Sequence, residues 1–405
     1  MVSNSNPVVD FIKTGIHELP LKAREDGFWK SLRDTGTLIW LDTGDMDEAE
    51  ANWTAEMSAL TTNNTLLNNE IQKGIYDRFI EEAGRFVKGL PREEKVREIA
   101  FMLNARHGLR LAARFGVNVS VELHTCTADD IDAIVSYGKR YHAIDPVHFI
   151  VKVPYTASGL LGARKLRDAG IRINFTLEFS ARENVIVTSV ARPDFLNVFL
   201  GRVGAYMVNN KLGDGSGAGE MAVLSSQKWV SELSTRNPWV TRLIAASLRN
   251  HEQLELLAGT DVYTIPPKVA ASGRKTLEGN FVNNRTREYP VSIFPGASGT
   301  GIEKFWSVDD KVLRAAASLS EKVPADADEL TDRMRNAGLP DMFPVLDDNE
   351  IRNIAGDGKI PVFSRWEKRL RDGSIGPDTL LTLAGLASFT ADQAMLDNRI
   401  RDIAG

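Results

Sequence analysis

The sequence of 405 residues predicts a (β/α)₈ TIM barrel with an N-terminal helical cover and a helical C-terminal extension. Eight short β-rich runs alternate with longer segments of helical spacing, as in parallel strands joined by crossover helices. Polar residues also stand at the ends of several runs, where barrels of this class collect their functional groups. We expect residues 1–36 to form the cover, 37–300 the barrel and 301–405 the extension.

The strands are expected where branched and aromatic residues cluster between turn signals. Their ranges are 37–42, 58–63, 118–124, 148–154, 171–179, 196–202, 240–247 and 261–266.

Helices are expected where apolar residues recur at three- and four-residue steps. Two such segments, 68–90 and 91–115, lie between the second and third strands and carry the apolar series Ile71, Ile75, Phe79 and Val96, Ile99, Leu103. In the N-terminal cover the candidate apolar contacts are Phe11, Ile12, Ile16 and Leu19.

The last third of the chain begins with a segment of different composition. Residues 268–300 are rich in Gly, Asn, Arg and Ser and predict a long connection. From residue 302 the helical pattern resumes and continues to the last residue, with breaks at Pro324, 338–340 and 356–358.

Composition narrows the classes of function. The formal net charge is −5, which disfavours a broad nucleic-acid-binding surface. No apolar run approaches the roughly 18–20 residues that a membrane span requires. Cys126 is the single cysteine, and the first residues lack the basic and apolar regions of a signal peptide, so a reducing cytoplasm is expected.

Lys152 interrupts the apolar run Phe-Ile-Val-Lys-Val-Pro with a lone ammonium. Burial favours the free amine, which can attack a carbonyl and form a Schiff base. A lysine at a strand end can equally send its head into water or pair with a carboxylate. The residues expected to lie near Lys152 in the fold distinguish between these alternatives.

Alternation along barrel strands places several polar side chains on the side of Lys152. These are Asp42, Glu122, Asn174 and Thr176, all near strand ends. Alone, each has a structural explanation: Asp42 as a helix cap, Glu122 as a partner for Lys152, and Asn174 and Thr176 as groups that satisfy the backbone. Together they point to a site, because inward positions usually hold branched apolar residues.

Two arginines follow the late strands. Arg202 ends the sixth run, and Arg249 follows the seventh, with Ser247 two residues before it. Guanidinium groups bind phosphate oxygens well, and barrel phosphate sites tend to lie at late strands. The alternative is that both arginines form surface ion pairs.

At this point the chain resembles the transaldolase family over roughly residues 37–270. The matching motifs occur in one order: Leu-Asp-Thr at 41–43, Leu-Thr-Thr-Asn at 60–63, Val-Ser-Val-Glu at 119–122, Val-Lys-Val-Pro at 151–154, Asn-Phe-Thr-Leu-Glu-Phe-Ser at 174–180, Phe-Leu-Gly-Arg at 199–202 and Ala-Ser-Leu-Arg-Asn at 246–250. The resemblance implies a Schiff-base barrel enzyme.

The resemblance also implies roles. Lys152 would form the Schiff base with a ketose phosphate, such as a fructose or sedoheptulose phosphate. Glu122 would move protons through a water held by Thr176, and Asp42 would take the proton of the C4 hydroxyl. A dihydroxyacetone unit would pass to an aldose phosphate, as in the pentose phosphate pathway.

Substrate contacts follow from the same resemblance. Asn63 and Asn174 would bind the hydroxyls of the three-carbon unit, and Arg202, Arg249 and Ser247 would bind the phosphate. Neither a metal nor a cofactor is expected. The partners would be sugar phosphates, with no nucleic acid and no membrane, and a homo-oligomer is compatible with the sequence.

Two alternatives remain open. Related aldolases, which release dihydroxyacetone, resemble a pattern with glutamine at the position of Glu122 and tyrosine at that of Phe199, so this chain matches the transferase pattern at both. A non-catalytic barrel that binds a sugar phosphate is the second. The chain departs from the family at Asn64, Glu183 and Asn197, which leaves the donor sugar open.

Overall fold

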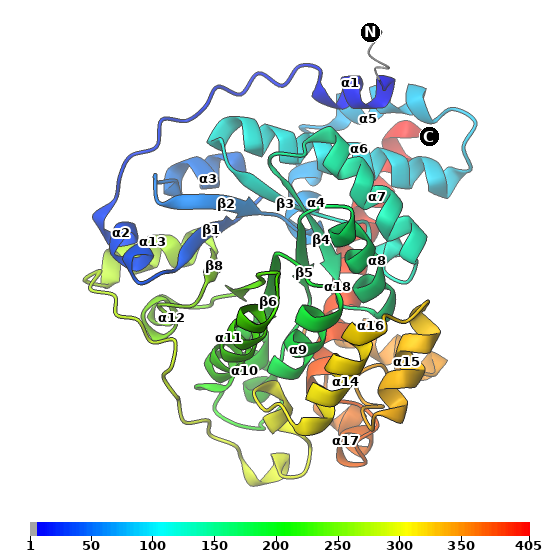
Figure 1. The fold of residues 1–405 in the computed structure, drawn as a ribbon. Coiled ribbons are helices and arrows are strands. Elements are labelled where there is room, and N and C mark those ends of the chain that lie inside the picture. The colour runs from blue at the N-terminus through cyan, green and yellow to red at the C-terminus, as the bar shows by residue number, and fades with distance from the viewer. Residues whose placement is uncertain (1–5) are drawn as a thin grey trace.

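The computed structural model describes residues 6–405 and shows eight parallel strands closed into a barrel in the order β1 to β8 (Figure 1). The strands are β1 (Leu38–Asp42), β2 (Met57–Thr61), β3 (Asn118–Glu122), β4 (Phe149–Pro154), β5 (Ile173–Thr176), β6 (Phe195–Phe199), β7 (Arg242–Ala246) and β8 (Val262–Ile265). Each lies within or beside its predicted range, so the predicted barrel is confirmed.

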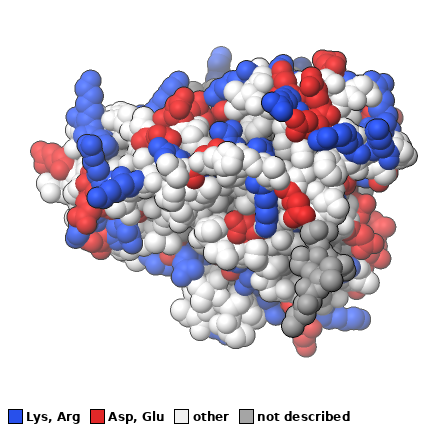
Figure 2. Space-filling model, turned by 90° about the horizontal axis from the view of Figure 1, so that it is seen from above, with Lys and Arg blue, Asp and Glu red and all other residues white. Residues whose placement is uncertain are grey.

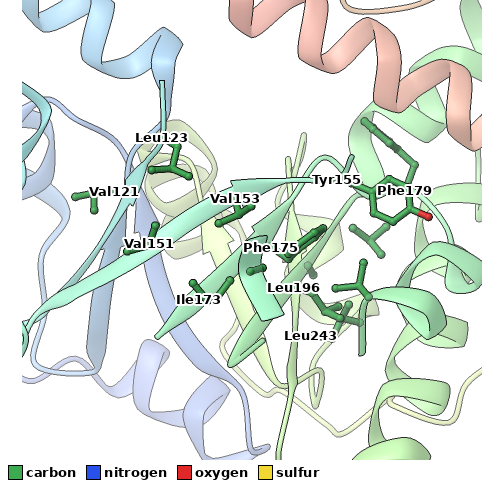
Figure 3. Close-up of a cluster of buried hydrophobic side chains, with 14 of the residues drawn as sticks. Val121, Leu123, Val151, Val153, Tyr155, Ile173, Phe175, Phe179, Leu196 and Leu243 are labelled. Carbon is green, nitrogen blue, oxygen red and sulfur yellow. The ribbon is translucent and has the colours of Figure 1, made fainter. Parts of the chain in front are cut away.

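Side chains alternate between two hydrophobic layers, as period-2 strands require. One set, Trp40, Ala59, Ile150, Ile244, Ala246 and Val262, fills the barrel interior. The other set faces the surrounding helices, and Figure 3 shows part of it, including Val121, Val151, Val153, Ile173 and Phe175. Because Val151 and Val153 face the helices, Lys152 between them faces the interior.

Helices cover the outside of the barrel between successive strands. They are α3 (Met46–Asn52), α4 (Asn64–Gln72), α5 (Asp77–Ala83), α6 (Arg92–Phe115), α7 (Ile131–Ile144), α8 (Ala157–Asp168), α9 (Ala181–Val190), α10 (Leu200–Asn209), α11 (Ala218–Arg236), α12 (Glu252–Leu256) and α13 (Pro267–Thr276).

Two predicted segments differ from the structure. The expected helix 68–90 is divided, because Gly74 adopts a left-handed φ of 80° between α4 and α5, and Ile75 there is 56 % exposed. The expected connection 268–300 begins with helix α13, in which Pro267 occupies the first turn, where its fixed φ favours a helix. Only its later part is irregular.

The N-terminal cover consists of α1 (Pro7–Lys13) and α2 (Gly27–Asp34), joined by an irregular segment. Residues 1–5 of the predicted cover lie outside the described residues. Ile12 is fully buried, and Arg106 of α6 donates to its carbonyl oxygen at 3.0 Å. Leu19 was expected to be an apolar contact and is 75 % exposed, because it lies in the irregular segment.

The C-terminal extension consists of α14 (Asp310–Glu321), α15 (Ala327–Asn336), α16 (Asp348–Asp357), α17 (Phe363–Arg371) and α18 (Pro377–Ala404). Helix α14 packs on α9, and α15 packs on α8. The long helix α18 returns to the other side of the barrel, where it contacts α4, α5 and α6 (Figure 1). The extension therefore spans much of the barrel rather than forming a separate lobe.

Charged side chains of both signs are interspersed on the face shown in Figure 2. None of the helices formed by residues 6–405 is long and apolar enough to cross a membrane.

Candidate active site

Lys152 lies at the centre of the site. Its side chain is 5 % exposed, and its Nζ lies 3.4 Å from a carboxylate oxygen of Glu122 and 3.2 Å from the carbonyl oxygen of Thr62. Glu122 and Lys152 are paired in the register of β3 and β4, so the sheet itself sets this proximity. The structure thus joins the predicted lysine and acid through backbone pairing.

Burial dominates the chemistry of Glu122. It raises the pKa of the Glu122 carboxyl, and the positive charge of Lys152 opposes that rise. A carboxyl group with a raised pKa, beside an amine, is suited to give and accept a proton.

Asp42 ends β1 on the same side of the barrel. Burial raises its pKa, and the charges of Lys152 and Arg249 oppose the rise. Asp42 therefore feels the charges of both Lys152 and Arg249.

A chain of side-chain hydrogen bonds crosses the interior from β3 to β6. Asn174 donates from its Nδ2 to Ser120 Oγ at 2.9 Å and accepts at its Oδ1 from Asn197 Nδ2 at 2.9 Å. Asn197, at a position where the resemblance leads us to expect serine, therefore fixes the orientation of Asn174. Thr176 is fully buried, and its hydroxyl has no hydrogen-bond partner within residues 6–405, so it can bind a water or a ligand.

Asn63 lies just beyond β2 and caps helix α4. Its Oδ1 accepts the backbone N–H of Leu66 at 2.9 Å. The oxygen thus has the capping role of the structural alternative, and only the amide nitrogen is free to reach a ligand.

The two arginines lie together, but on different kinds of element. Strand β6 ends at Phe199, so Arg202 stands in the first turn of α10 and not at a strand end as expected. A side chain at Gly201 would place its Cβ 2.2 Å from the carbonyl oxygen of Ser247, so glycine allows α10 to approach the loop after β7. Ser247 has a left-handed φ of 65° there.

Arg202 is 6 % exposed, and Arg249 lies closer to the surface. Burial, and then the charge of Arg249, lower the pKa of Arg202 to about 10. Two neighbouring guanidinium groups in this setting are a candidate anion site, since a bound anion would offset both effects.

Comparison with known proteins gives the family. A profile of the family described as Transaldolase/Fructose-6-phosphate aldolase matches residues 39–291, more than half of the chain. The chain belongs to this family. A transaldolase of Cricetulus griseus is 26 % identical over 325 residues, covering 74 % of this chain and 93 % of that protein. One from Xanthomonas euvesicatoria is 28 % identical over 245 residues, covering 58 % and 74 %.

The family match ends before helix α18. This helix covers one side of the site, and we call it the roof of the site. The ring centroid of Phe389 on α18 lies 6.0 Å from Lys152 Nζ and 5.6 Å from Arg202 Cζ. Gln393, one turn later, accepts from Asn64 Nδ2 at 2.6 Å. Sequence analysis missed Phe389 and Gln393, because helical spacing does not indicate where a distant helix docks.

Asn64 is one of the positions that depart from the family pattern. Its contact with Gln393 gives this departure a structural reason, since the amide joins the first turn of α4 to the roof.

A third missed residue is Glu178, in the loop after β5. It is fully buried, and both of its carboxylate oxygens lack a hydrogen-bond partner among the described residues. Burial raises the pKa of Glu178 well above its usual value, and the nearby Glu183 adds to the rise, so the surroundings favour the uncharged form of this carboxyl. The one feature of the sequence that could have indicated Glu178 was a carboxylate within an apolar run.

The docking of α18 should depend on pH through His124. His124 Nε2 lies 3.3 Å from an Asp397 carboxylate oxygen. Burial opposes the charge of His124, but Asp397 and Cys126 outweigh it and raise the pKa of His124 to about 9. Because the unfolded value is about 6.5, this contribution is complete below pH 6.5 and is lost as the pH rises through 9.

We therefore expect the free energy of unfolding to fall by about 1–3 kcal/mol between pH 6.5 and 9.5 through this group. Denaturant unfolding at both pH values checks this. His124→Gln should show a smaller decline, and the exposed His17→Gln should behave like the wild type. An equal decline in all three proteins would refute the assignment.

Proposed function

We propose that this chain transfers a dihydroxyacetone unit from a ketose phosphate to an aldose phosphate through a Schiff base on Lys152. The observation that carries the proposal is the buried pair of Lys152 and Glu122, 3.4 Å apart inside a closed barrel. An amine here is shielded from water and has a proton-transfer partner at hand, which are the two needs of imine formation.

In the first stage, Lys152 Nζ adds to the ketone carbon and forms a carbinolamine. Loss of water then gives the iminium ion. Glu122 lies close enough to donate the proton that the departing hydroxyl needs, directly or through one water. The free hydroxyl of Thr176, on the neighbouring strand, supports the placement of that water.

In the second stage, Asp42 accepts the proton of the C4 hydroxyl. The C3–C4 bond breaks, its electron pair enters the iminium to give an enamine, and the aldose phosphate leaves. Burial raises the pKa of Asp42, and the positive charge at Lys152 opposes that rise, which favours the ionised form that accepts the proton. Attack of the enamine on a second aldehyde reverses these steps.

The substrate phosphate is held by Arg202 and Arg249, with Ser247 as a hydroxyl donor. Asn174, which Asn197 and Ser120 orient, would bind a hydroxyl of the three-carbon unit, as would the free amide nitrogen of Asn63. Fixing the phosphate at one end fixes the reacting carbons relative to Lys152. We place this reaction in cytoplasmic sugar-phosphate metabolism of the pentose phosphate type.

Transfer is favoured over release by the surroundings of the enamine. Phe199 presents an apolar ring near Arg202, 5.5 Å from its Cζ, and Phe389 adds a second ring from the roof. Neither ring can donate a proton to the enamine carbon or hold a water for that purpose. The two apolar rings therefore support transfer to an acceptor aldehyde over release.

The test compares free dihydroxyacetone produced from fructose 6-phosphate with and without erythrose 4-phosphate. A transferase forms sedoheptulose 7-phosphate with acceptor and releases little dihydroxyacetone without it. Release at the same rate in both cases would identify a lyase.

Phe199→Tyr should shift the balance towards release. The added hydroxyl can position a water or donate a proton, and general acid catalysis of this kind supports at least about a tenfold faster release without acceptor. Phe199→Leu is the matched control, since it lacks the hydroxyl. Equal release rates for the tyrosine and leucine variants would contradict this account of Phe199.

A further inference from the structure

One aromatic ring of the roof lies against both ends of the site. The ring centroid of Phe389 is 6.0 Å from Lys152 Nζ and 5.6 Å from Arg202 Cζ, and both cations lie over the ring. Phe389 is 4 % exposed, so it is buried against the site and does not face solvent. A ligand that joins Lys152 to Arg202 must therefore pass along this ring.

Gly385, one turn before Phe389, allows helix α18 to approach so closely. A Cβ at Gly385 would stand 2.9 Å from Leu177 Cδ2 and 3.1 Å from Arg202 Nη1. Glycine inside a helix is about 1 kcal/mol less favourable than alanine. Its place in α18, where a side chain would press on Arg202, indicates that close packing of the roof on the site outweighs this cost.

Arg202 also depends on the roof for its position. Its Cζ lies 5.5 Å from the ring centroid of Phe199, at the end of β6, and 5.6 Å from that of Phe389. Cation–π contacts with rings from two different elements hold the guanidinium group in place. The ring of Phe389 therefore both covers the arginine end of the site and fixes it.

Polar contacts on either side of Phe389 hold the roof in place. Thr382, two turns before the ring, donates to the carbonyl oxygen of Leu177 at 2.9 Å, and Gln393, one turn after it, accepts from Asn64 Nδ2 at 2.6 Å. The roof is thus a fixed wall. A fixed, closely packed wall discriminates between ligands by their size.

One acid of the roof also acts on the arginine end. Asp392 accepts a hydrogen bond from the hydroxyl of Thr65. Burial lowers the pKa of Arg202, and the charge of Asp392 opposes that change. This carboxylate affects the phosphate end of any phosphorylated ligand equally, so it does not discriminate between carbon chains of different length.

We propose that Phe389 is a specificity-determining residue, which limits the length of the sugar phosphate that the site accepts. The inference rests on the proposed function at one point, namely that the ligand joins Lys152 to Arg202. With both ends fixed, each carbon beyond the length that fits must bend towards the ring of Phe389 and overpack it. The residue lies beyond residues 39–291, which the family profile matches, so that match does not assign it.

The test measures binding of a series of alditol phosphates with three to seven carbons by isothermal titration calorimetry on the full chain. These probes carry the phosphate but no carbonyl group, so they bind without forming a Schiff base. We expect affinity to rise to a maximum within the series and then to fall by about tenfold or more for the next carbon. Absence of binding by every member, or affinity that does not fall up to seven carbons, overturns the proposal.

Phe389→Ala should move the maximum to a chain at least one carbon longer, because the variant removes the ring that the longer chain meets. Phe389→Leu keeps most of the apolar packing of the roof, and should shift affinity in the same direction by a smaller amount. The matched control is Met395→Ala, since Met395 is 50 % exposed on the same helix, and it should keep the wild-type profile. An unchanged maximum in folded Phe389→Ala and Phe389→Leu, or an equal shift in Met395→Ala, would contradict the role of Phe389.

Transfer by the unaltered protein is a separate readout. Failure of transfer with the expected length dependence of binding would contradict the proposed function alone. Normal transfer without that length dependence would contradict this inference alone.

Discussion

Lys152→Ala should lower kcat/KM for transfer by about 10⁴-fold or more, because the variant has no nucleophile to form the covalent intermediate. The fold should survive. Removing the ammonium leaves Glu122 buried without its partner, but burial raises the pKa of that carboxyl and so favours its uncharged form. Steady-state kinetics and circular dichroism measure the two effects.

Lys139→Ala is the matched control, since Lys139 is an exposed lysine on α7. It should retain full activity. Transfer by Lys152→Ala at a rate near that of Lys139→Ala would show that the chemistry lies elsewhere.

Arg182→Ala should lower the free energy of unfolding by about 3–5 kcal/mol, because it leaves buried carboxylates without their partner. Arg182 lies at the start of α9 with its side chain 4 % exposed. Its guanidinium donates to both oxygens of Asp378 at 2.7 Å and to Asp341 at 2.7 Å. Lys304 also contacts Asp341, but Asp378 would keep no cation among residues 6–405.

The consequence should reach the roof of the site, since Asp378 stands in the first turn of α18. Denaturant unfolding and limited proteolysis of the C-terminal extension measure the loss. The control is Arg236→Ala, whose surface pair with Glu232 is worth no more than about 1 kcal/mol. Similar losses in the two variants would contradict the role given to the buried network.

The barrel and its inward residues followed from the sequence because strand periodicity is local information. Val151, Lys152 and Val153 already imply that the lysine faces opposite to its neighbours, and parallel register then places it beside Glu122. Arg202 shows the limit of such reasoning. Its place in the candidate anion site was inferred, but the boundary between strand and helix at Phe199 was not, because element ends are set by tertiary contacts.

The docking of helix α18 onto the site could not be predicted from the sequence. The approach of Phe389 to Lys152 joins residues more than 200 positions apart, and no spacing rule constrains such a contact. The same holds for the network of Arg182 and Asp378. The prediction that Leu19 makes an apolar contact was wrong for a different reason. An apolar residue in an irregular segment has no helical face to place it in the core.

Borohydride trapping tests the central claim most directly. The protein is treated with fructose 6-phosphate and sodium borohydride, digested, and sequenced by mass spectrometry. We predict a reduced dihydroxyacetone or hexose phosphate adduct on the peptide that carries Lys152, and no such adduct in Lys152→Ala. A folded protein that forms no adduct with fructose 6-phosphate or other ketose phosphates, or that carries the adduct on another lysine, would contradict the Schiff base at Lys152.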